Sequence, residues 1–145
     1  MDADFFKNLG ERLDIKELDV ESYSPPALAY IGDAVYEVYV RTLILSGGNA
    51  PVRKLHTRSV GYVKAKAQSG ILRKLMEELA PDELEVVRRG RNAKSGTIPK
   101  NVNLSEYKYA TGFEALIGYL YLKKDYKRLL EILRLSVSGC DGGGG

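Results

Sequence analysis

The sequence predicts an all-α domain, and three observations support this fold class. Apolar residues recur at helical spacing along most of the 145 residues, sustained strand-type alternation is absent, and capping signals bound the apolar segments. A chain of this length fits one domain, and its hydrophobic fraction of 44% is normal for a protein with a buried core. We therefore expect about six to seven helices joined by short connections.

Start and stop residues give the order of these helices. Ser24 is a suitable N-cap, Pro25 and Pro26 follow in the first turn, and Gly47 and Gly48 end the first expected helix. The expected helices, with a break at Ser69–Gly70 between the second and the third, cover residues 27–46, 52–67, 71–79, 81–91, 105–122 and 125–137.

Three segments are expected to lie outside the main helices. Residues 1–23 form an acidic, partly ordered lead-in, and residues 138–145, which end in four glycines, form a flexible tail. Residues 92–104 contain glycine, proline and three asparagines, a composition typical of a loop. The folded domain is therefore expected over residues 24–137.

The composition excludes several kinds of protein. A single cysteine, Cys140, provides neither a disulfide framework nor a cysteine-based metal site, and it favours a reducing, cytoplasmic compartment. No apolar run reaches the roughly 18 residues that a membrane span needs. The acidic N-terminus lacks the charged-then-apolar pattern of a signal peptide. We expect a cytoplasmic protein that does not interact with a membrane.

Charge is unevenly distributed along the chain, although the net charge is only +3. Residues 1–37 hold nine acidic and three basic residues, whereas residues 38–76 hold eight basic residues and no acidic one. A second acid-free stretch with five basic residues covers residues 86–105. Such segregation favours a basic face for a polyanion such as nucleic acid, and the alternative is a set of ordinary solvated helix faces.

Two carboxylates, Asp33 and Glu114, lie in the two most apolar expected helices. A buried carboxylate is normally paired, protonated or bound to a metal. Glycines flank both residues and would allow the two helices to cross closely. Converging carboxylates suit Mg²⁺, which takes one or two carboxylates, waters and phosphate oxygens, and such a site can hydrolyse a phosphodiester.

Structural roles for these carboxylates remain open at this stage. Asp33 could form an ion pair with Arg41 or another basic residue, although Glu37, one turn from both Asp33 and Arg41, is the better partner for that arginine. Glu114 could instead be exposed at a helix edge.

Two segments resemble the ribonuclease III family. Residues 27–37 read ALAYIGDAVYE and resemble its signature helix, and residues 113–122 read FEALIGYLYL and resemble its second metal-binding helix. The similarity covers residues 24–133. The chain departs from the main family at Ala29 and Thr111, where those enzymes carry two further acids, and it lacks room for their C-terminal double-stranded-RNA-binding domain.

A short chain of this kind, with the segment RRGRNAKSGTIPKN over residues 88–101, resembles the compact Mini-III branch of the family. The resemblance implies a homodimeric endoribonuclease that cleaves double-stranded RNA and matures large-subunit ribosomal RNA precursors. It also implies that Asp33 and Glu114 hold Mg²⁺ and that Asp33 is catalytic. A ribosomal protein that presents the substrate is a further expected partner.

RNA would have to be held by the domain itself, through phosphate contacts that weaken with salt. The residues expected to make them are Lys64, Lys66, Arg88, Arg91, Lys94 and Lys100. The only histidine, His56, lies among basic residues and is interpreted as a surface or RNA-contacting residue rather than a catalytic one. Tyr30, Tyr36 and Tyr39 could form the dimer interface, or could simply pack in the core.

Three other functions compete with this interpretation. A non-catalytic, double-stranded-RNA-binding ribosome-assembly factor would explain the absent acids at Ala29 and Thr111. A helical protein-interaction domain would leave the basic stretches unexplained. A hydrolase of small phosphate substrates would need a phosphate-binding glycine loop that the sequence does not contain.

Overall fold

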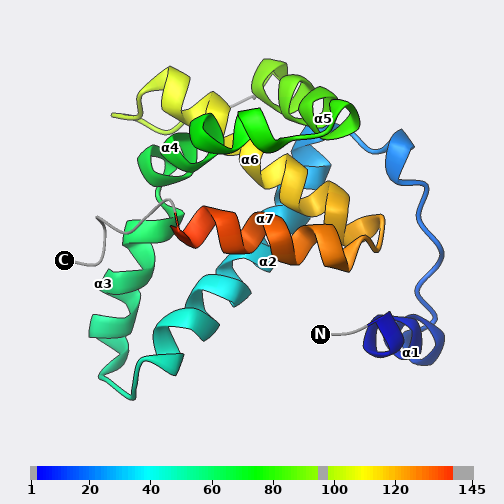
Figure 1. Cartoon of the computed structure of the whole chain (residues 1–145), viewed down its shortest axis with the longest axis horizontal. Helices are drawn as coiled ribbons and strands as arrows, with labels where there is room; N and C mark the ends of the chain where they lie inside the picture. The colour runs from blue at the N-terminus through cyan, green and yellow to red at the C-terminus, as the bar shows by residue number, and fades with distance from the viewer. Residues whose placement is uncertain (1–2, 95–97, 139–145) are drawn as a thin grey trace.

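Helices and their connections make up the whole of the computed structural model in the residues that it describes, 3–94 and 98–138, where no strand occurs (Figure 1). The all-α class is therefore confirmed. Within those residues no helix is both long and apolar enough to cross a membrane. The elements are α1 (Ala3–Leu13), the 3₁₀ turn η1 (Val20–Ser22), α2 (Pro25–Ser46), α3 (Val52–Val63), α4 (Ala65–Leu75), the 3₁₀ turn η2 (Met76–Glu78), α5 (Pro81–Asn92), α6 (Leu104–Leu122) and α7 (Tyr126–Ser138).

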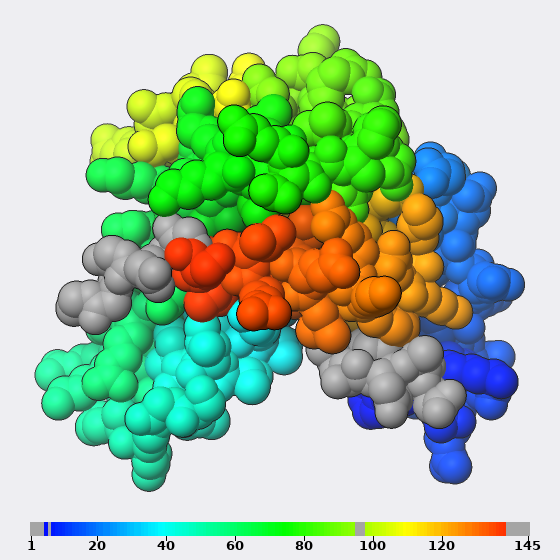
Figure 2. All heavy atoms as spheres, viewed as in Figure 1, coloured from blue at the N-terminus to red at the C-terminus, as the bar shows by residue number. Residues whose placement is uncertain are grey.

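Helix α6 is the centre of the fold, and α2, α4, α5 and α7 all pack against it. Its side chains from Phe113 to Leu120 are buried except for Glu114, so this helix is apolar on nearly every side. Tyr36 of α2 and Phe113 of α6 meet edge to face at the crossing, with ring centroids 5.0 Å apart. Figure 2 shows α7 lying across one face of the molecule, between α4 and α5 on one side and α2 and α3 on the other.

Glycines set the distance between α6 and its neighbours. A side chain at Gly32 of α2 would overlap the main-chain carbonyl of Glu114, and one at Gly118 would overlap that of Leu28. The two helices therefore cross backbone to backbone, as the flanking glycines predicted. Gly90 of α5 lies in similar contact with α6, because its missing Cβ would come within 2.8 Å of a main-chain Cα atom.

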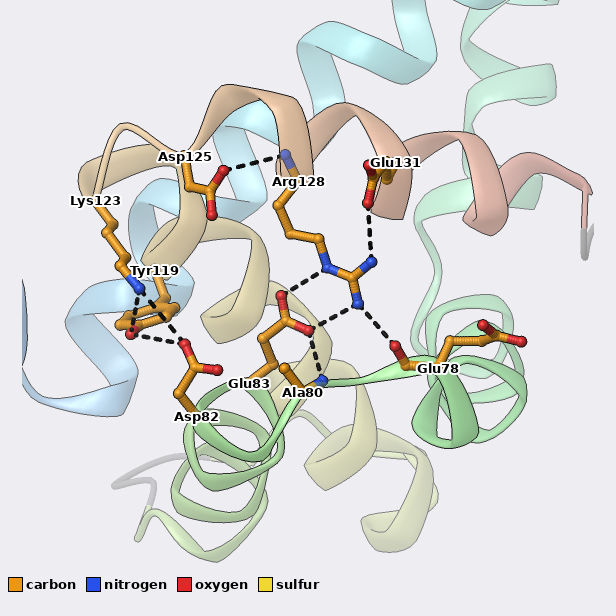
Figure 3. Close-up of polar contacts among 9 residues, drawn as sticks. All are labelled: Glu78, Ala80, Asp82, Glu83, Tyr119, Lys123, Asp125, Arg128 and Glu131. Atoms are coloured by element: carbon orange, nitrogen blue, oxygen red, sulfur yellow. Dashed lines mark hydrogen bonds and ion pairs between the residues drawn. The ribbon is translucent and has the colours of Figure 1, made fainter.

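A buried ion pair joins α5 to α7 (Figure 3). Arg128 donates two hydrogen bonds of 2.8 Å to the carboxylate of Glu83, which is only 3% exposed. The same guanidinium donates to the carbonyl of Glu78 at 2.8 Å and to Glu131 at 3.0 Å, and the N–H of Ala80 donates to Glu83 at 2.9 Å. The buried carboxylate is thus fully hydrogen-bonded, as a buried charge requires.

Most predicted helix ends agree with the structure, but one predicted break is wrong. The chain bends at Lys64, whose extended backbone ends α3 and begins α4. Ser69 and Gly70, predicted to end a helix, lie inside α4, where Ser69 is buried and Gly70 faces open space. The lead-in also holds a helix, α1, that the sequence analysis did not predict. Residues 139–145 of the expected tail lie outside the described residues.

Candidate active site

Asp33 and Glu114 meet where α2 crosses α6. Asp33 directly follows Gly32, and the main-chain carbonyl of Glu114 is the group that Gly32 contacts. The two carboxyl groups are close enough to share a hydrogen bond. Asp33 is exposed and Glu114 is half-buried, so the pair lies at the surface of the crossing rather than inside the core.

The surroundings of Glu114 disfavour its charged form. Burial, followed by the hydrogen bond and the negative charge of Asp33 and by the charge of Glu37, raises the pKa of Glu114 to about 9. Glu114 therefore holds a proton at neutral pH in the metal-free protein. A bound cation would reverse this preference, because it favours the ionised form of both carboxylates.

This raised pKa predicts a pH-dependent stability. Protonated Glu114 stabilises the metal-free fold below its unfolded pKa, and the contribution is lost as the pH rises toward about 9. We expect the melting temperature of the metal-free protein to fall over this range. Glu114→Gln, which keeps the shape and cannot ionise, should flatten the profile. Parallel melting profiles for the two proteins would show that Glu114 is already ionised at neutral pH.

The carboxylate pair opens into a cleft of about 450 Å³. Two lysines, Lys94 from the end of α5 and Lys108 from α6, line this cleft together with Asp33 and Glu114. The remaining lining residues are neutral: Pro26, Ala29, Tyr30, Gly90, Ala93, Tyr107 and Thr111. The cleft is thus lined by two acids and two cations among neutral residues.

The chemistry of the two acids fits Mg²⁺. No group of three or more aspartate, glutamate, histidine or cysteine residues that could hold a metal occurs in residues 3–94 and 98–138. Two adjoining carboxylates suit Mg²⁺, which keeps several waters and takes phosphate oxygens as further ligands. Glu37 forms an ion pair of 2.9 Å with Arg41, as expected, so the alternative pairing of Asp33 with this arginine is wrong.

Comparison with known proteins identifies the family. Residues 26–125 match the family model described as the ribonuclease III domain, a match that includes both Asp33 and Glu114. The chain belongs to the ribonuclease III family.

Individual relatives narrow the assignment to one branch of this family. The chain is 54% identical over 118 residues to a Mini-ribonuclease 3 of Thermoanaerobacter sp. (strain X514), covering 81% of this chain and 83% of that protein. It is 45% identical over 131 residues to a Mini-ribonuclease 3 of Clostridium tetani, covering 90% and 85%. A crystal structure of a Fusobacterium nucleatum protein superposes with a TM-score of 0.75 at 33% identity, covering 83% of this chain and 97% of that one. The chain is an endoribonuclease of the Mini-ribonuclease 3 type, the branch that the sequence predicted.

Two neutral residues in the cleft mark a difference between this chain and the main ribonuclease III family. Ala29 and Thr111 stand where the main ribonuclease III family carries further acids, and both line the cleft of this enzyme. The hydroxyl of Thr111 donates to the carbonyl of Tyr107 in its own helix at 3.0 Å. These two positions therefore share the cleft with Asp33 and Glu114 but add no carboxylate to it.

The six residues predicted to bind RNA lie in different settings. Only Lys94 lines the cleft. Arg91 lies along Gly112, and its guanidinium stacks on the ring of Tyr109 at 4.3 Å, where Arg73 also stacks at 3.9 Å. Arg88 forms a surface ion pair with Glu85. The other three are exposed: Lys64 at the α3–α4 bend, Lys66 on α4, and Lys100 between α5 and α6.

The three tyrosines proposed for the dimer interface differ in how buried they are. Tyr36 is fully buried, so core packing is the correct interpretation for that residue, and Tyr39 is half-buried against the core. Tyr30, in contrast, is 83% exposed at the cleft. His56 is exposed on α3, as expected for a surface residue, and does not line the cleft.

The sequence analysis missed Lys108 as a cleft residue. Its helical spacing was the available signal, because Lys108, Thr111 and Glu114 follow one another at intervals of three residues, which makes each the neighbour of the next on the helix surface. Lys108 lies on α6 near its start.

Proposed function

We propose that this endoribonuclease hydrolyses double-stranded RNA with Mg²⁺ held by Asp33 and Glu114. The contact between the two carboxylates, in a cleft that two lysines also line, is the observation that carries the proposal. Members of this family act on double-stranded RNA and generally depend on a divalent metal. When bound, the metal would lower the pKa of water and offset negative charge at phosphorus.

The residues of the cleft have separate tasks in this mechanism. Asp33, which is exposed, and Glu114, which is half-buried, are the residues that would hold the cation. Lys94, which lines the cleft, pairs with a phosphate of the RNA. Water gives one proton to the solvent, and the resulting hydroxide oxygen bonds to phosphorus. The bond from phosphorus to the 3′-oxygen breaks, and the 3′-oxygen takes a proton from the solvent. The products are a 5′-phosphate and a 3′-hydroxyl.

A two-fold homodimer is the assembly we propose. One cleft cuts one strand, and a symmetric pair presents two clefts to a duplex. The family is typically dimeric, and Tyr30, beside the cleft, is the most exposed of the three proposed tyrosines. Sedimentation should give a dimer, and Tyr30→Ser should shift it toward the monomer.

The substrate we propose is a base-paired segment of a large-subunit ribosomal RNA precursor, which a ribosomal protein could present. This assignment rests on the likeness to the Mini-ribonuclease 3 group. The test is cleavage of that segment, with and without large-subunit ribosomal proteins, beside an unrelated duplex of equal length. Equal cleavage of both duplexes under both conditions would remove the support for a dedicated ribosomal substrate.

Basic residues around the cleft are expected to bind the phosphates of the RNA. Replacing Arg88, Arg91 and Lys94 together by alanine should weaken RNA binding and reduce the salt dependence of log Kd, by as much as about one unit of slope for each phosphate that the variant no longer neutralises. Binding is measured without Mg²⁺ across a range of NaCl concentrations. An unchanged slope would show that these residues do not contact RNA.

Product analysis tests the reaction itself. Wild-type protein is incubated with an end-labelled duplex and with either of its single strands, with and without Mg²⁺. We expect cutting of the duplex only, dependent on Mg²⁺, with 5′-phosphate ends that a kinase cannot label until a phosphatase has removed the phosphate. Cutting of single strands, or 5′-hydroxyl products, would contradict the proposed reaction.

A further inference from the structure

The two acids of the cleft cannot offset the negative charge that develops during the reaction. Two ionised carboxylates and one divalent cation sum to zero. A bound phosphodiester adds one negative charge, and the attack of hydroxide on phosphorus adds a second in the transition state. Groups aimed at charge that develops during the reaction are usually the largest contributors to catalysis. The cleft must therefore offer cations besides the metal.

Lysines are the only cationic side chains among the described residues that line this cleft, and they are Lys94 and Lys108. Neither forms an ion pair with another described residue. Lys108 is exposed and lies on the same helix as Glu114, about 9 Å away along the helix axis. Its flexible four-carbon stem lets the ammonium reach a phosphate held at the carboxylates.

We infer that Lys108 is a catalytic residue whose ammonium contacts a non-bridging oxygen of the scissile phosphate and offsets the charge that builds up there. The inference rests on the proposed phosphodiesterase function. It gives Lys108 a different task from that of an ordinary RNA-contacting lysine, because its interaction strengthens as the phosphate gains charge.

The neutral residues Ala29 and Thr111 support this role. Both line the cleft, and neither adds negative charge that would attract Lys108 away from the substrate. Thr111, three residues after Lys108, has its hydroxyl engaged with its own helix. When Asp33 and Glu114 hold the cation, the substrate phosphate is the remaining anionic partner for the ammonium of Lys108 in the cleft.

The test compares Lys108→Ala with Lys108→Arg and with Lys127→Ala, which removes an exposed lysine on α7 outside the cleft. Three quantities are measured: the single-turnover cleavage rate at saturating enzyme with Mg²⁺, the duplex Kd without Mg²⁺, and the binding of Mn²⁺ to the RNA-free protein. Lys108→Ala should lower the rate about 100-fold. It should weaken the duplex Kd by less than about fivefold and leave Mn²⁺ binding intact.

Lys108→Arg should recover much of the rate because it keeps the positive charge, and Lys127→Ala should match the wild type in all three measurements. An unchanged rate with a weaker Kd would reduce Lys108 to an RNA-contacting residue, and abolished Mn²⁺ binding would give it a structural role. Either result overturns the inference. Failure of the wild type to cut a duplex would instead remove the proposed function itself.

Discussion

Gly118→Ala is expected to destabilise the protein by about 3–5 kcal/mol, which lowers the melting temperature by roughly 10–20 °C. The new methyl group would overlap the main-chain carbonyl of Leu28 and approach the side chain of Ile31. Main chain cannot rotate away as a side chain can, so α2 and α6 must separate. Because Asp33 and Glu114 lie on these two helices, cleavage should be abolished in the fraction that remains folded.

A matched control exists within the same fold. Gly70 also lies inside a helix, but a Cβ there would meet no atom within 4 Å. Gly70→Ala should therefore stabilise the protein by about 0.5–1 kcal/mol, because alanine restricts the unfolded chain and favours the helix. Thermal unfolding of both variants separates helix propensity from helix packing. If the two substitutions behaved alike, close backbone contact between α2 and α6 would be wrong.

Arg128→Met is the second change with a large expected effect, a destabilisation of about 3–5 kcal/mol. It would leave the carboxylate of Glu83, which is 3% exposed, without its cationic partner. Chemical denaturation measures the change. The double variant with Glu83→Gln should recover part of it, because no unpaired charge then remains buried. Arg134→Ala, at an exposed position of the same helix, should leave the stability unchanged.

The same pair predicts how acid affects stability. Burial alone would raise the pKa of Glu83, but hydrogen bonds from Arg128 and Ala80 and the charge of Arg128 lower it below its unfolded value. The pair therefore stabilises the fold above the unfolded pKa of about 4.5, and this contribution is lost as the pH falls through the folded pKa. The Arg128→Met variant should lose stability already at neutral pH and show a weaker acid transition.

The fold class and the carboxylate pair could be predicted from the sequence because both depend on local patterns. Carboxylates in the two most apolar helices, flanked by glycines, predicted that these helices cross closely and bring the acids together. The contacts of Gly32 and Gly118 with the opposite backbone confirm the close crossing. The break at Lys64 could not be predicted, because a lysine is a good helix former and its extended backbone is set by packing. Gly70, in contrast, resembled a break but lies harmlessly on the exposed side of α4.

The lysines that line the cleft were harder to predict than the two carboxylates. Lys94 follows the end of α5 and Lys108 lies on α6, and only the fold shows that they line one cleft. Arg91 was expected to contact RNA directly, but its stacking on Tyr109 also fixes it against α6. Side-chain direction at the end of α5 depends on tertiary contacts that periodicity does not encode.

The central claim is that Asp33 and Glu114 form the magnesium site of a nuclease. Its most direct test is the cleavage of an end-labelled RNA duplex, with and without Mg²⁺, by the wild type and by Asp33→Asn, which keeps the shape and removes the charge. We predict Mg²⁺-dependent cutting by the wild type, a decrease of at least about 10³-fold in the variant, and duplex binding retained in both. Binding without cutting in either protein, or equal cutting in both, would contradict the claim.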